Sequence, residues 1–407
     1  MSGRGIKAKA RRDASTFAFA FTAPLPLTLY VHIPWCVRKC PYCDFNSHEA
    51  RAPIDERGYI DALLADLDHD MPLVDGRALQ SIFIGGGTPS LFAPESIDRL
   101  LCGVRARLAC VPDMEITLEA NPGTVEQGRF AEFRSAGINR LSIGVQSFDD
   151  DLLGRIGRIH GRREAIRAAE SAHDAGLANF NLDLMYGLPK QTLDQALADL
   201  QTACDLEPAH LSHYQLTLEP NTWFHRHPPP LPDDEQIWDM QEACQRVLAE
   251  QGYTQYEVSA YAQDGRQCRH NLNYWQFGDY LGIGAGAHAK LTDTSIQQAR
   301  RLWKHKQPKA YLQSIAEHSA HGGDTALLPE DASFEFMINA LRLNAGFTES
   351  LYRERTGLGL ETIMAILQTG LEQNLLEQDG DTWRASSHGQ RFLNDLLGLF
   401  APEKGNA

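Results

Sequence analysis

The most informative part of the chain is LTLYVHIPWCVRKCPYC, residues 27–43. Its first seven residues, Leu27–Ile33, are mostly β-branched, aliphatic or aromatic, a composition that predicts a strand. Cys36, Cys40 and Cys43 follow directly, with the spacing CxxxCxxC. Thiolates are soft ligands that select iron–sulfur clusters or zinc. The stretch therefore predicts a metal-binding loop at the end of a strand.

Two kinds of metal centre fit this loop. A structural zinc ion takes four protein ligands, so His32 or His48 would have to join the three cysteines. A four-iron cluster held by three thiolates instead leaves one iron open to a small molecule. We favour the cluster, because the cysteine spacing coincides with a position at the end of a strand.

The remaining cysteines and the N-terminal residues indicate the cellular compartment of the protein. The other five of the eight cysteines are scattered, which is not the pattern of a disulfide framework, and we expect a cytoplasmic protein. The first twelve residues hold five basic side chains and no acid. Such a start also fits a signal or transit peptide, but we favour a basic arm over residues 1–26. No run of eighteen apolar residues occurs, so no transmembrane helix is expected.

The overall composition is that of an ordinary globular protein. Hydrophobic residues make up 43% and charged residues 22% of the 407, and the formal net charge is −15. This length fits two or three domains. The acidic balance disfavours the broad basic surface that nucleic-acid binding needs, so no nucleic-acid partner is expected.

Short apolar runs alternate with helical patterns through the first half of the chain. The expected strands are Leu27–Ile33, Ser81–Ile84, Glu115–Glu119, Arg140–Gln146, Phe180–Tyr186 and His210–Leu218. The expected helices are Tyr59–Leu67, a segment starting near Pro94, and residues 124–135, 161–175 and 192–203. Repeated strand–helix units predict an α/β fold, in which right-handed crossovers curl six parallel strands into a partial (β/α)6 barrel over residues 27–220. Functional residues of such a barrel lie at the C-terminal ends of its strands.

The remaining chain is expected to form an extension of the barrel, residues 221–325, and a C-terminal domain, residues 326–407. Residues 219–233 are rich in proline and predict a loop, followed by a helix over 234–251. The C-terminal pattern predicts helices over Phe334–Leu343, Thr348–Thr356, Leu360–Gln373 and Gln390–Leu397, with a hairpin over Leu375–Trp383. Helices with a two-stranded wing indicate a mainly helical, winged-helix-like domain.

The CxxxCxxC loop and the run Tyr30–Trp35 before it resemble the radical S-adenosylmethionine (SAM) superfamily. They are most similar to the branch that contains anaerobic coproporphyrinogen III oxidase and its heme-chaperone relatives, and the resemblance covers residues 27–397. It implies a partial (β/α)6 barrel with a [4Fe–4S] cluster on Cys36, Cys40 and Cys43, and SAM bound to the open iron.

The resemblance also implies a set of residues around SAM. Gly86, Gly87 and Thr88 follow the second strand, and on the residues alone they are equally well explained by a tight strand–helix turn. Taken one at a time, the polar residues on these strands are better explained by structural hydrogen bonds or ion pairs. The residues that match SAM-contacting positions are Tyr30, Tyr42, Gly86, Gly87, Thr88, Glu119, Gln146, Arg158 and Asp183. The guanidinium of Arg158 would suit the methionine carboxylate.

A second element, Cys268–Trp275, matches the HNxxYW pattern of the heme-chaperone branch. Heme iron accepts an axial imidazole, which makes His270 the candidate heme ligand, with Tyr274 and Trp275 as apolar walls. Cys268 is an alternative ligand, and a structural hydrogen bond is the alternative role for His270.

The departures from the branch separate two functions. Its anaerobic oxidases carry a further cysteine two residues after the third, where this chain has Phe45, and the N-terminal segment is short for an oxidase. We therefore expect a heme chaperone that delivers heme to acceptor proteins, namely respiratory hemoproteins. The alternatives are an oxygen-independent coproporphyrinogen III oxidase and a zinc-stabilised binding module. The sequence leaves open whether the protein is an enzyme that cleaves SAM, whether it forms a homodimer and whether it makes peripheral membrane contact.

Overall fold

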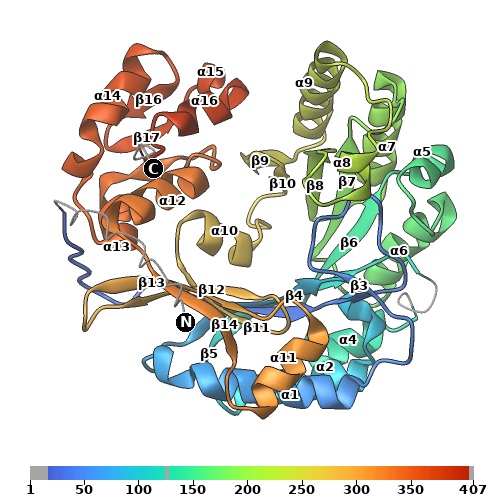
Figure 1. The fold of residues 1–407 in the computed structure, drawn as a ribbon. Coiled ribbons are helices and arrows are strands. Elements are labelled where there is room, and N and C mark those ends of the chain that lie inside the picture. The colour runs from blue at the N-terminus through green and yellow to red at the C-terminus, as the bar shows by residue number, and fades with distance from the viewer. Residues whose placement is uncertain (1–16, 124–127, 403–407) are drawn as a thin grey trace, which may run out of the picture.

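The centre of the molecule is a curved sheet with the strand order β14-β13-β12-β11-β1-β4-β5-β6-β7-β8-β10-β9 (Figure 1). The computed structural model describes residues 17–123 and 128–402. Six neighbouring strands are parallel and form the predicted partial barrel. These strands are β1 (Leu27–Ile33), β4 (Leu79–Gly86), β5 (Cys110–Ala120), β6 (Arg140–Gln146), β7 (Phe180–Tyr186) and β8 (His210–Gln215). The α/β barrel prediction is confirmed, with β1, β6 and β7 at the predicted bounds.

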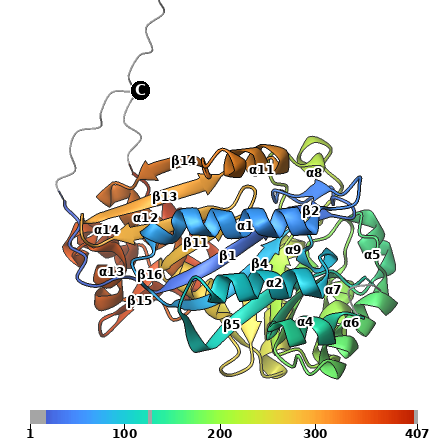
Figure 2. The ribbon, with the colours of Figure 1, turned by 90° about the horizontal axis from the view of Figure 1, so that it is seen from below.

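Helices connect the parallel strands and cover the outer face of the barrel, as α1 and α2 do over β1 and β4 in Figure 2. Their bounds are α1 Glu56–Asp70, α2 Pro94–Arg105, α4 Phe130–Ala136, α5 Asp150–Arg155, α6 Arg162–Asp174 and α7 Leu193–Asp205. Local chemistry sets their starts: Asp55 caps α1 by accepting from the Gly58 amide at 3.0 Å, and Pro94 occupies the first turn of α2. The first residues of the helix expected over 124–135, residues 124–127, lie outside the described part of the chain, as do residues 1–16 of the expected basic arm.

The extension adds strands to both edges of the barrel, which the sequence pattern did not predict. Strand β11 (Asp279–Ile283) pairs parallel with β1, and β12 (His288–Asp293), β13 (Gln298–Lys304) and β14 (His321–Ala326) follow in antiparallel order. At the other edge, β10 (Ala260–Ala262) and β9 (Thr254–Glu257) continue antiparallel from β8. The extension also contains α9 (Asp234–Glu250), α10 (Arg269–Trp275) and α11 (Pro308–Ala316). The proline-rich loop was expected to lack helix, but it holds the short helix α8 (Trp223–Arg226), which Thr222 caps through the His225 amide.

The C-terminal part has its own apolar core and a small sheet, β15-β17-β16. Its elements are α12 (Pro329–Ala340), β15 (Phe347–Thr348), α13 (Glu349–Thr356), α14 (Met364–Glu372), β16 (Leu376–Asp379), β17 (Thr382–Ala385), α15 (Ser387–Arg391) and α16 (Leu393–Gly398). The predicted hairpin is present, with Gly380 at φ +61° in its turn. Phe21 and Leu25, from the segment before β1, also belong to this core.

Three helices of this domain differ from the prediction. The helix expected over Phe334–Leu343 is α12, which begins earlier, with Pro329 in its first turn. The helix expected over Leu360–Gln373 begins with a separate 3₁₀ turn, Leu360–Thr362, where the Thr362 hydroxyl donates to the Gly359 carbonyl. The helix expected over Gln390–Leu397 is two short helices, since Ser386 caps α15 earlier by accepting from the Gly389 amide. Across residues 17–123 and 128–402, no helix is both long enough and apolar enough to cross a bilayer.

Candidate functional site

The three clustered cysteines lie on a loop that leaves the C-terminal end of β1. Short parallel strands, β2 (Trp35–Cys36) and β3 (His48–Glu49), clamp the base of this loop. The Cys43 amide donates to the Cys40 carbonyl at 3.2 Å, and the Lys39 ammonium donates to the carbonyls of Phe45 and Ser47. The loop is thus held by its own backbone and by Lys39, while the Cys43 sulfur lies 3.8 Å from the Ser47 hydroxyl.

A cavity of about 580 Å³ opens beside this loop at the C-terminal ends of the barrel strands. All three cysteines line it, together with most of the residues that the sequence singled out. These lining residues are Tyr42, Gly86, Gly87, Thr88, Glu119, Gln146, Arg158 and Asp183. Residues from four different strand ends therefore meet around one space, as the barrel geometry predicts.

The glycine turn after β4 packs tightly against the cysteine loop. Gly86 has φ +117°, and a Cβ there would lie 2.5 Å from the His32 ring; a Cβ on Gly87 would lie 2.5 Å from the Trp35 carbonyl oxygen. The Thr88 amide donates to that same carbonyl at 2.7 Å. Packing within the chain alone accounts for both glycines, and it also brings their backbone to the wall of the cavity.

Two largely buried carboxylates line the cavity from β5 and β7, which β6 separates. Glu119 accepts from the Gly86 amide at 2.9 Å, and burial raises the pKa of Glu119 to about 7. Asp183 accepts from Asn181 Nδ2 at 2.8 Å and from the Ser142 hydroxyl at 3.2 Å, and burial raises the pKa of Asp183 as well. Both groups are costly to keep ionised in the protein alone, so a cationic ligand in the cavity would stabilise their charged forms.

Arg158 supplies a positive charge to the same cavity. Its guanidinium donates to Asn121 Oδ1 at 2.6 Å and to the Gly144 carbonyl, while its buried Nε–H has no partner. Tyr42 lies close by, and burial raises the pKa of its phenol while Arg158 opposes that rise. The cavity thus carries both carboxylates and a guanidinium, a set of groups suited to a zwitterionic ligand with an ammonium and a carboxylate.

Some lining residues were not singled out from the sequence. Asn121 follows Glu119 by two residues and donates to the Thr88 hydroxyl at 2.7 Å, so the strand-end rule was sufficient to find it. Tyr214, on β8, donates to Gln146 Oε1 at 2.7 Å and was hidden inside an expected strand. Gln146 itself has φ +72°, which turns the chain at the end of β6.

Tyr30 and His270 do not line this cavity. The Tyr30 hydroxyl pairs with His32 Nδ1 at 3.0 Å, and its ring centroid lies 6.5 Å from that of His270. His270, on α10, is 8% exposed, and its Nδ1 lies 3.2 Å from the Ser81 hydroxyl near the start of β4. A single ring separates His270 from the glycine turn: the Phe83 ring centroid lies 5.2 Å from that of His270, and Phe83 Cε1 would lie 3.0 Å from a Cβ on Gly85.

The HNxxYW element therefore lies against β4, near the start of that strand. Cys268 is buried and its thiol donates to Glu115 Oε1 at 3.5 Å, while burial lowers the pKa of His270 to about 3. Trp275 is partly exposed, its ring lies 4.4 Å from the Arg342 guanidinium, and its Nε1–H has no partner. Helix α10 thus contacts both the barrel strands and α12 of the C-terminal domain (Figure 1).

Comparison with known proteins defines the class. A sequence model of the radical SAM superfamily matches residues 30–203, and one of the HemN C-terminal domain matches residues 327–392. The solved structure of coproporphyrinogen III oxidase (HemN) from Escherichia coli has a TM-score of 0.79 and 25% identity to this chain, covering 93% of this chain and 90% of that one. The chain is a radical SAM protein with HemN-like architecture.

Relatives of similar length define the family of the chain within this superfamily. It is 50% identical to the heme chaperone HemW of Escherichia coli and 49% identical to that of Haemophilus influenzae, over 93% of this chain and 99% of each relative. The heme chaperone HemW of Bacillus subtilis is 34% identical over 92% of this chain and 99% of its own length. The chain belongs to the HemW family.

Membership of the superfamily implies a [4Fe–4S] cluster and SAM, and the donor set fits both. Thiolates from three cysteines are the ligands that iron–sulfur clusters take. Among the described residues, the one group of three ligating side chains with ligand atoms within 4.8 Å of one another excludes these cysteines. Sulfurs on a single tetrahedral zinc ion would lie only about 3.8 Å apart. The wider spread of the sulfurs fits a multi-iron cluster better than one zinc ion.

Proposed function

We propose that this chain is a heme chaperone, which binds heme and passes it to acceptor hemoproteins while carrying a [4Fe–4S] cluster and SAM. The observation that carries the proposal is the 50% identity, over 99% of its length, to a relative named heme chaperone. Phe45 supports it from within the chain. Its side chain is 59% exposed beside the cysteine loop, at the position where the oxidases of this branch have a cysteine.

Cys36, Cys40 and Cys43 would hold the cluster and leave one iron for SAM. When bound, the cluster supplies the electron for reductive cleavage of SAM. Burial raises the pKa of the Cys36 and Cys43 thiols, so iron binding must displace their protons. The loop and the cavity walls would exclude water from the cluster face.

The lining residues would hold SAM by charge and shape. Arg158 would bind the methionine carboxylate through its unpartnered Nε–H, and Glu119 would accept from the ammonium. Backbone groups of Gly86, Gly87 and Thr88 would contact the ligand along the cavity wall.

Four further residues would complete the SAM pocket. Asp183 and Gln146 suit the ribose hydroxyls, and Tyr42 lies between the cluster loop and Arg158. Tyr30 would act as a positioning residue, since its hydroxyl orients the ring of His32 beneath Gly86.

His270 would ligate heme iron. Burial keeps its imidazole neutral, and the neutral ring is the form that binds iron. Because His270 is 8% exposed, heme binding at this residue requires α10 to move away from β4. The partly exposed Tyr274 and Trp275 would then face the macrocycle. The heme site would thus lie between α10 and the barrel strand β4, near the start of that strand, whereas the cluster site lies at its end.

The second candidate is an oxygen-independent coproporphyrinogen III oxidase, favoured by the structural match to HemN. The two functions are distinguished by one pair of assays on anaerobically reconstituted protein. We expect the protein to transfer heme to a b-type apocytochrome, and to leave coproporphyrinogen III intact when SAM and a reductant are present. Decarboxylation of coproporphyrinogen III would establish the oxidase instead.

The same preparation tests the heme ligand. Heme titration, followed by the Soret band, should show at least tenfold weaker heme affinity for His270→Ala. The control His388→Ala, at an exposed histidine of the C-terminal domain, should bind heme with unchanged affinity. Equal titrations of both variants would remove His270 from the site. We further propose that the acceptors are respiratory hemoproteins and that the protein acts in the cytoplasm.

A further inference from the structure

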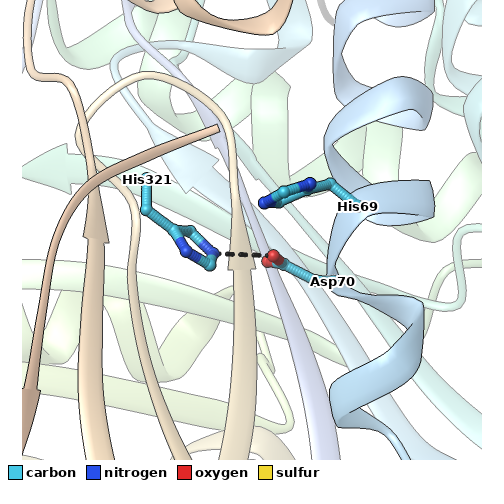
Figure 3. A group of neighbouring side chains, drawn as sticks. All are labelled: His69, Asp70 and His321. Carbon is cyan, nitrogen blue, oxygen red and sulfur yellow. Dashed lines mark hydrogen bonds and ion pairs between the residues drawn. The ribbon is translucent and has the colours of Figure 1, made fainter. Parts of the chain in front are cut away.

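Three ligating side chains meet far from the cysteine loop, at the C-terminal end of α1. His69 and Asp70 are the last two residues of that helix, and His321 is the first residue of β14 (Figure 3). One ligand atom from each lies within 4.8 Å of the others. His321 Nε2 is 2.8 Å from Asp70 Oδ1, and the His69 ring stacks edge-on against the His321 ring at 5.1 Å between centroids. None of the three lines the large cavity.

A buried cluster of charged side chains, two carboxylates and one ammonium, lies next to this group. Asp66 and Asp70 are both buried, and Lys304, also buried, contacts both carboxylates at 2.6 and 2.8 Å. Asp66 also accepts from the Tyr311 hydroxyl and the Gly284 amide, both of which are neutral. When both are ionised, the two carboxylates and the single ammonium carry a net charge of −1 where water is largely excluded. The C-terminal end of α1 adds partial negative charge at the same place, so a cation is stabilised there.

The ligand types select the kind of cation. Two imidazoles and one carboxylate suit divalent first-row transition metals, whereas Ca²⁺ and Mg²⁺ prefer sets made of oxygen. In a tetrahedral zinc site with bonds of about 2.0–2.1 Å, neighbouring ligand atoms are about 3.3 Å apart. The 2.8 Å separation of His321 Nε2 from Asp70 Oδ1 is close to this, and the exposed His69 is free to turn toward them.

We propose that His69, Asp70 and His321 form a binding site for a divalent transition-metal ion of the Zn²⁺ type, which joins the end of α1 to the edge strand β14. Metal binding needs the lone pair of His321 Nε2, so the ring proton resides on Nδ1 in the bound state. Water takes the fourth position, on the solvent side next to His69. The site is independent of the heme-chaperone function and of the cluster.

The experiment uses full-length protein in which the cluster already occupies Cys36, Cys40 and Cys43, so that these clustered thiolates do not compete for the added metal. Zn²⁺ is added by equilibrium dialysis, and zinc and iron are measured per chain. The variants are His69→Gln and His321→Gln, with His305→Gln as the matched control, because His305 is an exposed histidine next to Lys304. His69 is exposed and its ring contacts that of His321, so its replacement by glutamine should leave folding intact.

We expect about one Zn²⁺ per chain for the wild type and His305→Gln, and at least tenfold weaker binding for His69→Gln and His321→Gln at unchanged iron content. Zn²⁺ should also slow amide hydrogen exchange over His321–Ala326 in the wild type but not in His69→Gln. Equal zinc binding by all four proteins, or no zinc bound by the wild type, would overturn the proposal. The His321–Asp70–Lys304 contacts would then be a metal-free structural network.

Discussion

The guanidinium Nη1 of Arg158 lies 3.7 Å from the sulfur of Cys40, so the charged wall of the cavity touches the cysteine loop directly. The same guanidinium donates to Asn121 Oδ1, and the Asn121 amide in turn donates to the hydroxyl of Thr88 in the glycine turn. A chain of contacts thus runs from one proposed cluster ligand to the proposed SAM pocket. Cluster loading and SAM binding should therefore depend on each other.

Arg158→Lys should weaken SAM binding at least tenfold. Lysine keeps the charge but loses the planar fork of donors, and a hydrogen bond to a charged group contributes about 1.5–3 kcal/mol. The measurement is calorimetric titration of cluster-loaded protein with SAM. Arg155→Lys is the control, because Arg155 donates only to the Pro189 carbonyl at 3.0 Å among its described contacts. Unchanged SAM affinity of Arg158→Lys would exclude Arg158 as the carboxylate ligand.

Replacing Cys36, Cys40 or Cys43 by serine should abolish the cluster. Anaerobically purified wild type should contain about four irons per chain with the broad absorbance of an iron–sulfur centre. Cys102→Ser, at an exposed cysteine of α2, should keep both. A colourless wild type that contains zinc, or full iron retention in the loop variants, would contradict the assignment.

Glu119→Gln should change how stability depends on pH. The pKa of Glu119 is about 7 in the folded protein, above its ordinary value of 4.5, so the folded state binds more protons between these values. The stability that this proton contributes is present below pH 4.5 and is lost as the pH rises through 7. Over that range the wild type should lose about 3 kcal/mol relative to Glu119→Gln.

Thermal midpoints of both SAM-free proteins at pH 5 and pH 8 measure this difference. From pH 5 to pH 8, the thermal midpoint of the variant should rise by several degrees relative to that of the wild type. A difference that stays constant with pH would show that Glu119 is ionised throughout.

Lys304→Met should destabilise the fold by about 3–5 kcal/mol, because it leaves the Asp66 and Asp70 carboxylates buried without their ammonium. The matched control is Arg300→Met on the same strand, which removes only the exposed pair with Asp324 and should cost at most about 1 kcal/mol. Denaturant unfolding of the two variants gives the comparison. Similar losses would mean that the buried network contributes no more than a surface pair.

The parallel barrel was predictable because short runs rich in strand-forming residues alternate with helical patterns along the first half of the chain. The strands that the extension adds at the edges of the barrel were not predictable. Strand β13, for example, contains Arg300, Arg301 and Lys304 and is polar in sequence. Lys304 is buried only because Asp66 and Asp70, more than 230 residues earlier, neutralise it. Partners supplied from so far away leave no periodic signal in the sequence.

The cavity residues were predictable for a related reason. The ends of parallel strands converge, so Glu119, Gln146 and Asp183 meet wherever the barrel forms. The location of His270 was not predictable. Helix α10 reaches the start of β4 through an extension whose path depends on long-range strand pairing. The group of His69, Asp70 and His321 was missed for the same reason, since β14 brings its third member across the sheet.

The pairing of β1 with β11 also constrains how the molecule is made. Leu27 is aligned with Asp279, 252 residues later in the chain. At a synthesis rate of about 5–20 residues per second, one side of β1 stays unpaired for roughly 13–50 s after it leaves the ribosome. An open apolar strand edge is a template for aggregation. The nascent chain must therefore be shielded along that edge until its second half emerges.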